Sequence, residues 1–68
     1  MASIARITEI SSTSQTSFED AIQAGINRAN QTLRNVRGAW IKEQNIEIND
    51  GKVAGYRVNM LITFVLEG

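Results

Sequence analysis

Three side chains of this sequence have the type and spacing that bear most directly on chemistry: Trp40, Glu43 and Glu47. Trp40 is the only tryptophan, and its indole either offers a flat platform to a planar ligand or packs under a helix or in a subunit interface. Glu43 and Glu47 fall on one face of an expected strand, about 13 Å apart at roughly 3.3 Å per residue. They are therefore too far apart to share a proton or a metal ion within one chain.

The residue types that are missing exclude most enzyme classes. The 68 residues contain no cysteine and no histidine. There is therefore no disulfide framework, no zinc or haem site of the usual kind, and no Cys-His or Ser-His nucleophilic pair. The remaining acids are scattered, so we predict a protein that is not an enzyme and has no metal ligands within one chain. A cation site assembled by symmetry from several carboxylates is the alternative.

The charge balance excludes two classes of partner. Seven Lys and Arg residues balance seven Asp and Glu residues, so there is no basic surplus for a nucleic acid backbone or an anionic membrane surface. No apolar run approaches the ~20 residues of a transmembrane helix, and residues 1–6 lack the basic start of a signal peptide. We expect a cytoplasmic protein with neither nucleic acid nor membrane as a partner.

The first half of the chain is typical of a strand, a loop and a helix. Residues 3–10 alternate in polarity, which predicts a strand. The hydroxyl-rich stretch 11–17 predicts a loop, because its side chains compete for backbone hydrogen bonds. Apolar residues then recur at helical spacing from position 17 to about position 34, and Ser17 with Asp20 fits a capping box at the helix start.

The second half is typical of a hairpin. Residues 39–49 and 52–66 alternate in polarity, and Asp50-Gly51 between them has the sequence of a two-residue turn. In the first of these strands the alternation places Trp40 and Asn45 on opposite faces. In the last strand one face is entirely apolar and is expected to form the core against the helix. Its members are Tyr56, Val58, Met60, Ile62, Phe64 and Leu66.

Together these elements predict an α+β fold of the β-α-β-β type, in which a three-stranded antiparallel sheet packs on one helix. One helix covers only one face of such a sheet, and the other face keeps apolar residues such as Leu61 and Val65. A core in a domain below ~70–80 residues also rarely supplies more than roughly 3–5 kcal/mol of stability. Self-association is therefore expected for two independent reasons.

Several short segments, in this order and spacing, resemble a known family. They are ISSTS at 10–14, SFEDAI at 17–22, ANQTLRNV at 29–36, Trp40, Asp50-Gly51, YRV at 56–58 and FVLE at 64–67. The family is the dodecins, small flavin-binding proteins, and the resemblance covers essentially the whole chain. It implies a single dodecin-like domain over residues 1–68 that assembles into a hollow homododecamer of tetrahedral symmetry.

The resemblance also implies a flavin site. In dodecins, flavins lie in antiparallel pairs at two-fold axes between symmetry-related tryptophans, and Trp40 occupies the matching position. The family's glutamine for the pyrimidine edge is replaced by Arg57, which carries a charge and only donates hydrogen bonds. Arg57 either contacts the flavin or forms a salt bridge with Glu43 or Glu47. Asn45 falls where some members place a polar residue for the ribityl hydroxyls.

The function implied by the resemblance is non-enzymatic flavin storage. Riboflavin, FMN or FAD would be sequestered from solvent between Trp40 residues of symmetry-related subunits, and contact with indole would quench its excited state and so protect against light. The alternative is a flavin-free dodecin-like shell with a structural or ion- or small-molecule-binding role. Some relatives with arginine at the Arg57 position also lack the tryptophan and are not flavin proteins.

Overall fold

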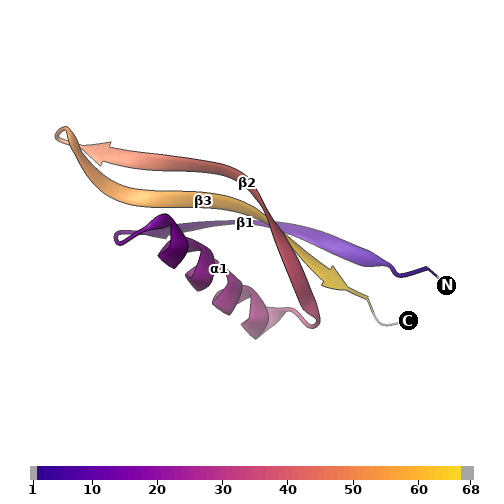
Figure 1. Ribbon diagram of the computed structural model, residues 1–68. Coiled ribbons are helices and arrows are strands. Elements are labelled where there is room, and N and C mark those ends of the chain that lie inside the picture. Colours follow the sequence, from indigo (N-terminus) through magenta and orange to yellow (C-terminus); the bar gives the residue numbers. More distant parts are fainter. Residues whose placement is uncertain (1, 67–68) are drawn as a thin grey trace.

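The computed structural model describes residues 2–66 and has the expected β-α-β-β order. The elements are β1 (Ala5–Ser14), α1 (Phe18–Thr32), β2 (Val36–Asn49) and β3 (Lys52–Val65). The strands form one antiparallel sheet in the order β1-β3-β2, and α1 packs on one face of it (Figure 1). The predicted three-stranded antiparallel sheet on one helix is therefore confirmed.

β1 is longer than the sequence indicates, because the Ser- and Thr-rich stretch continues the strand. We expected a loop from residue 11, but residues 11–14 pair with residues 56–59 of β3. The connection to α1 is correspondingly short. Local competition by hydroxyl side chains is weaker here than the ladder that β3, the central strand, offers to its neighbour.

The start of α1 is fixed by two serines. Ser17 is the N-cap, and its side chain accepts a hydrogen bond of 3.0 Å from the backbone N–H of Asp20. The carboxylate of Asp20 accepts a 2.6 Å hydrogen bond from the hydroxyl of Ser14 rather than from the cap itself. The buried Ser14 hydroxyl in turn accepts from the backbone N–H groups of Thr16 and Ser17. Half of the predicted capping box is thus present: Ser17 caps the N–H of Asp20, but Ser14 takes the place of Asp20 as the acceptor for the backbone N–H of Ser17.

The helix ends and the second strand begins earlier than expected. α1 ends at Thr32, and the backbone N–H of Leu33 donates to the carbonyl of Ala29 at 2.8 Å. Asn35 has a φ of 59°, in the left-handed region that asparagine tolerates better than most residues, and β2 starts directly after it. At the other end of β2, Asp50 and Gly51 both have positive φ, as the predicted two-residue turn requires.

The core lies between α1 and the centre of the sheet. Val58, Met60 and Ile62 of β3 are fully buried, and Ala21 and Ala29 of the helix pack on them. The predicted burial of these three residues of β3 is therefore confirmed. Tyr56 and Phe64, from the same predicted face, are only partly buried. Leu66 lies beyond the end of β3 and is 43% exposed, so its assignment to the core is wrong.

The chain is less compact than a globular monomer of its size. Its radius of gyration is 14.1 Å, compared with about 11 Å for a compact domain of this length. Its accessible surface is 5191 Å², compared with about 4,200 Å² for a globular monomer of this mass. Figure 1 shows the β2–β3 hairpin extending past the helix at one end. Exposed Ile46, Ile48 and Val53 lie on that hairpin, which is a surface suited to a subunit contact.

Candidate functional site

The candidate site lies on the sheet face that α1 does not cover, which we call the open face. Since Val58, Met60 and Ile62 point to the helix, the residues between them on β3 point away from it. The antiparallel register extends this assignment to both neighbouring strands. The open face carries Glu9, Ser11 and Thr13 of β1, Trp40, Glu43, Asn45 and Glu47 of β2, and Gly55, Arg57, Asn59 and Leu61 of β3.

A β-bulge in β2 decides which residues of that strand share the open face. Ile41 pairs with Met60 and Glu43 pairs with Asn59, so Lys42 is an extra residue between them. The extra residue reverses the alternation. Trp40 and Asn45 consequently lie on the same face, and the expectation that they lie on opposite faces is wrong.

Trp40 is well placed for stacking. It pairs with Leu61 across the sheet, and its side chain is 72% exposed, more than any other large apolar side chain in residues 2–66. The prediction left open whether the indole packs under the helix. It does not, because the helix covers the other face. What remains is a flat aromatic surface that is available to a planar ligand or to a second subunit.

Arg57 is engaged within its own chain. Its guanidinium forms an ion pair with the carboxylate of Glu47 and donates from Nε to the hydroxyl of Thr13 at 3.4 Å. These side chains converge over Gly55, where an added Cβ would lie 2.9 Å from Glu47 Oε1 and 3.3 Å from Thr13 Cγ2. Of the two salt bridges considered, the one with Glu47 is formed and the one with Glu43 is not.

Asn45 and Arg57 form a row across the sheet that is separate from the row of Trp40. Asn45 pairs with Arg57, whereas Trp40 pairs with Leu61, four residues further along β3. At about 3.3 Å per residue these rows are roughly 13 Å apart. The structure therefore brings the three predicted site residues onto one face but does not bring Arg57 or Asn45 into contact with Trp40.

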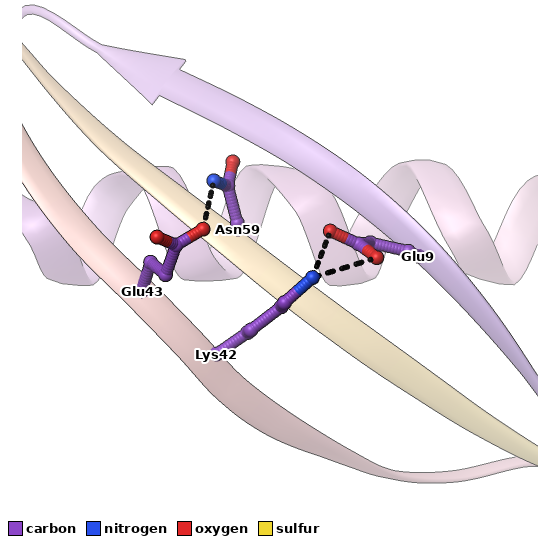
Figure 2. A network of polar contacts seen from close by, with 4 residues as sticks. All are labelled: Glu9, Lys42, Glu43 and Asn59. Carbon is purple, nitrogen blue, oxygen red and sulfur yellow. Dashed lines mark hydrogen bonds and ion pairs between the residues drawn. The ribbon is translucent and has the colours of Figure 1, made fainter.

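Two polar contacts lie side by side on the open face (Figure 2). The ammonium of Lys42 reaches across β3 to both carboxylate oxygens of Glu9 at 3.2 and 3.3 Å. Beside it, the amide nitrogen of Asn59 donates to Glu43 Oε1 at 3.1 Å. Sequence reasoning assigned no site role to Asn59, Lys42 or Glu9. In the sequence, only the position of Asn59 between Arg57 and Leu61 on one face of the strand could have indicated that it shares a face with the candidate site residues.

The described part of the chain contains neither an internal metal cluster nor a membrane span. Within residues 2–66 no three His, Cys, Asp or Glu side chains come close enough to hold an ion. The helix in that part is too short and polar to cross a membrane.

A groove of about 490 Å³ lies elsewhere, between α1 and β1. Thr8, Ile10 and Ser12 line one wall, and Gly25, Arg28 and Ala29 line the other. It lies on the helix side of the sheet, away from Trp40, and it is not part of the candidate site.

Comparison with known proteins gives a consistent result. The family model for dodecin matches residues 4–67. A dodecin structure from Streptomyces davaonensis is 37% identical and superposes with a TM-score of 0.92, covering 100% of both chains. The dodecin of Streptomyces coelicolor is 32% identical over 97% of this chain and 94% of its own, with a TM-score of 0.91.

One similar structure is named for a different ligand. The calcium dodecin of Mycobacterium tuberculosis, described as a calcium-chelating antigen with a novel calcium-binding site, is 28% identical. It covers 94% of this chain and 91% of its own, with a TM-score of 0.81. No curated protein sequence matches significantly. Because the family model spans nearly all of the chain and the fold agrees over its full length, the chain belongs to the dodecin family.

Proposed function

We propose that this dodecin is a non-enzymatic flavin-binding and storage protein in which the flavin ring stacks on Trp40. The observation that carries the proposal is the position of this single tryptophan. Its indole is 72% exposed on the open face, opposite Leu61 and beside the amide and hydroxyl groups of neighbouring rows. A large exposed aromatic is costly unless a partner covers it, and a planar ring is a suitable partner.

Binding at this site depends on assembly. An aromatic stack contributes about 0.5–1.5 kcal/mol beyond the area it buries, whereas micromolar affinity needs about 8 kcal/mol. One chain offers an open surface rather than an enclosed pocket, so burial between two subunits supplies the remainder. We therefore propose a homododecamer of this single domain, with each flavin held between Trp40 residues of adjoining subunits. Storage follows, because a flavin enclosed in this way is removed from solvent.

We propose that Asn45 and Arg57 contact the part of the ligand that lies farthest from Trp40. Asn45 is exposed and can both donate to and accept from the ribityl hydroxyls. Arg57 meets the ligand only if its guanidinium leaves Glu47 or shares its donors, since both of its recorded contacts lie within the chain.

The second candidate is a flavin-free shell that binds ions or has a structural role. The engagement of Arg57 by Glu47 and Thr13 favours it, since these side chains fill part of the open face without a ligand. The calcium dodecin among the similar structures shows that a relative of this fold binds an ion. In this chain such a site would need carboxylates from several subunits, as residues 2–66 of one copy supply no cluster.

Titration of the purified oligomer with riboflavin separates the two candidates. Flavin fluorescence is expected to fall to a saturating plateau, and Trp40→Ala is expected to abolish the quenching. Ile48→Ala serves as the matched control, because Ile48 is 70% exposed on the same strand but lies at the hairpin, away from Trp40. Size-exclusion chromatography checks that both variants keep the oligomer, since the hairpin surface is suited to a subunit contact. Quenching that persists in Trp40→Ala would refute the site. A dodecamer that quenches no flavin and binds calcium would support the second candidate.

A further inference from the structure

The turn of the β2–β3 hairpin consists of Asp50 and Gly51, and both residues are exposed to solvent. We propose that Asp50 is a site of spontaneous backbone modification, at which aspartate converts to isoaspartate through a cyclic succinimide. The reaction needs no ligand and no second protein, and water is its only co-reactant. The inference is therefore independent of the proposed flavin site.

The chemistry joins a side-chain carboxyl group to the next backbone nitrogen. The nitrogen of Gly51 attacks Cγ of the protonated Asp50 side chain, and a new C–N bond closes a five-membered ring. One water molecule leaves, formed from the carboxyl hydroxyl and the amide hydrogen. A second water molecule then opens the ring. Opening at Cγ restores aspartate, whereas opening at the original backbone carbonyl leaves the chain running through Cγ, which is isoaspartate.

The structure leaves both reacting groups accessible. A Cβ added at Gly51 would meet no atom within 4 Å beyond its two chain neighbours, so open space surrounds this residue. The carboxylate of Asp50 has no recorded hydrogen bond or ion pair within residues 2–66. Asp20, the other aspartate of the chain, is different, because its carboxylate accepts from the hydroxyl of Ser14 at 2.6 Å and lies in the first turn of α1.

The backbone of the turn is held in an unfavourable conformation. Asp50 has a φ of 52° and Gly51 a φ of 75°. Glycine adopts such angles readily, whereas they bring the Cβ of an L-residue close to its own backbone. Closure of the succinimide ring requires rotation about ψ of Asp50, which takes this residue out of the turn geometry. The reaction therefore proceeds from a hairpin end that has opened.

Little packing opposes opening at this end of the hairpin. Only two residue pairs lie between the turn and the nearest register shift, Ile48 with Val53 and Asn49 with Lys52. All residues from 48 to 54 are exposed, and none belongs to the hydrophobic core or packs against it. Figure 1 shows the hairpin extending past the end of α1. Segments with so few buried apolar contacts open at a small fraction of the free energy of global unfolding.

Isoaspartate would change the hairpin permanently. It adds a methylene carbon to the backbone of a turn whose two-residue length sets the register of both strands. The adjacent pairs would be lost, and the exposed side chains of Ile48 and Val53 would leave their positions. Because this surface is suited to a subunit contact, chains that carry isoaspartate are expected to dissociate from the oligomer.

The test follows residue 50 in the purified oligomer during incubation at 37 °C. Trypsin cleaves after Lys42 and Lys52, so one peptide, residues 43–52, carries the turn. Liquid chromatography with electron-transfer mass spectrometry separates its aspartate and isoaspartate forms. The free peptide 43–52, incubated in parallel, gives the rate without a fold. Isoaspartate is expected to form in the oligomer less than about a hundredfold more slowly than in the peptide, because local opening is sufficient.

Asp50→Asn provides a second measurement in a variant that keeps the turn, since Asn-Gly favours the same turn type. Its amide closes the same ring with loss of ammonia, and ring opening by water then leaves a carboxylate that changes the peptide mass. Asn35 is the matched control within the same molecule. It also has a left-handed φ of 59°, but β-branched Val36 follows it and its carbonyl accepts from the N–H of Val65 at 3.1 Å. We expect Asn35 to keep its amide.

The possible failures are distinguishable. Slowing by about a hundredfold or more in both the wild-type oligomer and Asp50→Asn would refute the site, because the reaction would then need global unfolding, which slows it by more than about a thousandfold. Loss of the Asn35 amide as fast as that of residue 50 in Asp50→Asn would refute the special reactivity of the hairpin turn. Size-exclusion chromatography tests the consequence: isoaspartate is expected to be enriched severalfold in species smaller than the oligomer, and equal proportions would refute the effect on assembly.

Discussion

Arg57 and Glu47 form an ion pair over Gly55, on the open face of the sheet and directed toward the β2–β3 hairpin. The geometry is possible because residue 55 has no side chain: a Cβ there would lie only 2.9 Å from Glu47 Oε1. The pair holds the guanidinium at the end of the face that is remote from Trp40. The arginine that replaces the family's glutamine therefore has an ion-pair partner within its own chain.

The first prediction concerns the strength of this pair. The two side chains are 41% and 43% exposed, so solvent and salt screen their attraction, and pairs of this kind are worth about 0.2–1 kcal/mol. Glu47→Gln is expected to lower the free energy of unfolding by that amount at low ionic strength and by almost nothing in 1 M NaCl. Urea denaturation at one protein concentration measures both values.

Glu43→Gln is the matched control for this prediction. Glu43 accepts from Asn59 and has no recorded ion pair within residues 2–66, so its stability effect is expected to be insensitive to salt. A loss above about 2 kcal/mol in Glu47→Gln that persists in 1 M NaCl would contradict the prediction. It would mean that assembly buries the Arg57–Glu47 pair.

The fold could be predicted from the sequence because its strongest signals are local. Asp50-Gly51 specifies the turn, the helical spacing of apolar residues specifies α1, and the alternation of β3 specifies the buried face. The extension of β1 over residues 11–14 could not be predicted in this way. Those hydroxyl side chains favour loops locally, and the hydrogen bonds that hold them in a strand come from β3, more than 40 residues away.

The composition of the site was less accessible to sequence reasoning. Trp40 could be identified by its type alone, but the face that it shares with Asn45 depends on the bulge at Lys42. A bulge has no signature in the alternation that precedes it, and one extra residue moves everything beyond it to the opposite face. The hydrogen bond from Asn59 to Glu43 was missed because a single asparagine in a strand gains meaning only from its neighbour in space.

The second prediction concerns the buried hydroxyl before the helix. Ser14 is 8% exposed and takes part in three hydrogen bonds, with Asp20, Thr16 and Ser17. Ser14→Ala is expected to destabilise the protein by about 1–3 kcal/mol, since it leaves two backbone N–H groups and a carboxylate without this partner. The thermal midpoint of unfolding is the measurement.

Ser11→Ala provides the comparison for Ser14→Ala. Ser11 lies on the same strand but is exposed, so its replacement is expected to change the stability by no more than about 0.5 kcal/mol. Equal effects of the two substitutions would show that the hydroxyl of Ser14 does not anchor the start of the helix.

The third prediction tests the contact between Gly25 and Met60. A Cβ added at residue 25 would clash with Met60 Cε and would lie 3.2 Å from Ser12 Cβ. Gly25→Ala improves helix propensity by about 1 kcal/mol but forces the terminal methyl group of Met60 to move, and overpacking of this kind costs about 1–3 kcal/mol. We expect a net loss of stability that is smaller when Met60→Leu is also present, because leucine removes the terminal methyl group that clashes.

A double-mutant cycle measured by urea denaturation checks the third prediction. The expected coupling between the two substitutions is at least about 0.5 kcal/mol and favourable, as for residues in direct contact. Additive effects would show that the helix moves away from β3 as a unit and that Met60 does not limit the approach. Ala24→Gly, at an exposed position of the same helix, reports the propensity term by itself.

The last prediction asks which flavin the open face favours. Lys42 is balanced by Glu9 and Arg57 by Glu47, so the carboxylate of Glu43 keeps an uncompensated negative charge between the two pairs. The phosphate of FMN carries about −1.5 to −2 charges at neutral pH, and two like charges about 8 Å apart in water repel by roughly 0.5 kcal/mol per charge pair. FMN is therefore expected to bind a few-fold more weakly than riboflavin at low salt. The difference should disappear near 0.5 M NaCl, where screening is strong.

Parallel quenching titrations of both flavins at two salt concentrations measure this difference in affinity. FMN that binds more tightly than riboflavin at low salt, and loses this advantage in high salt, would contradict the prediction and point to a cationic group supplied by an adjoining subunit.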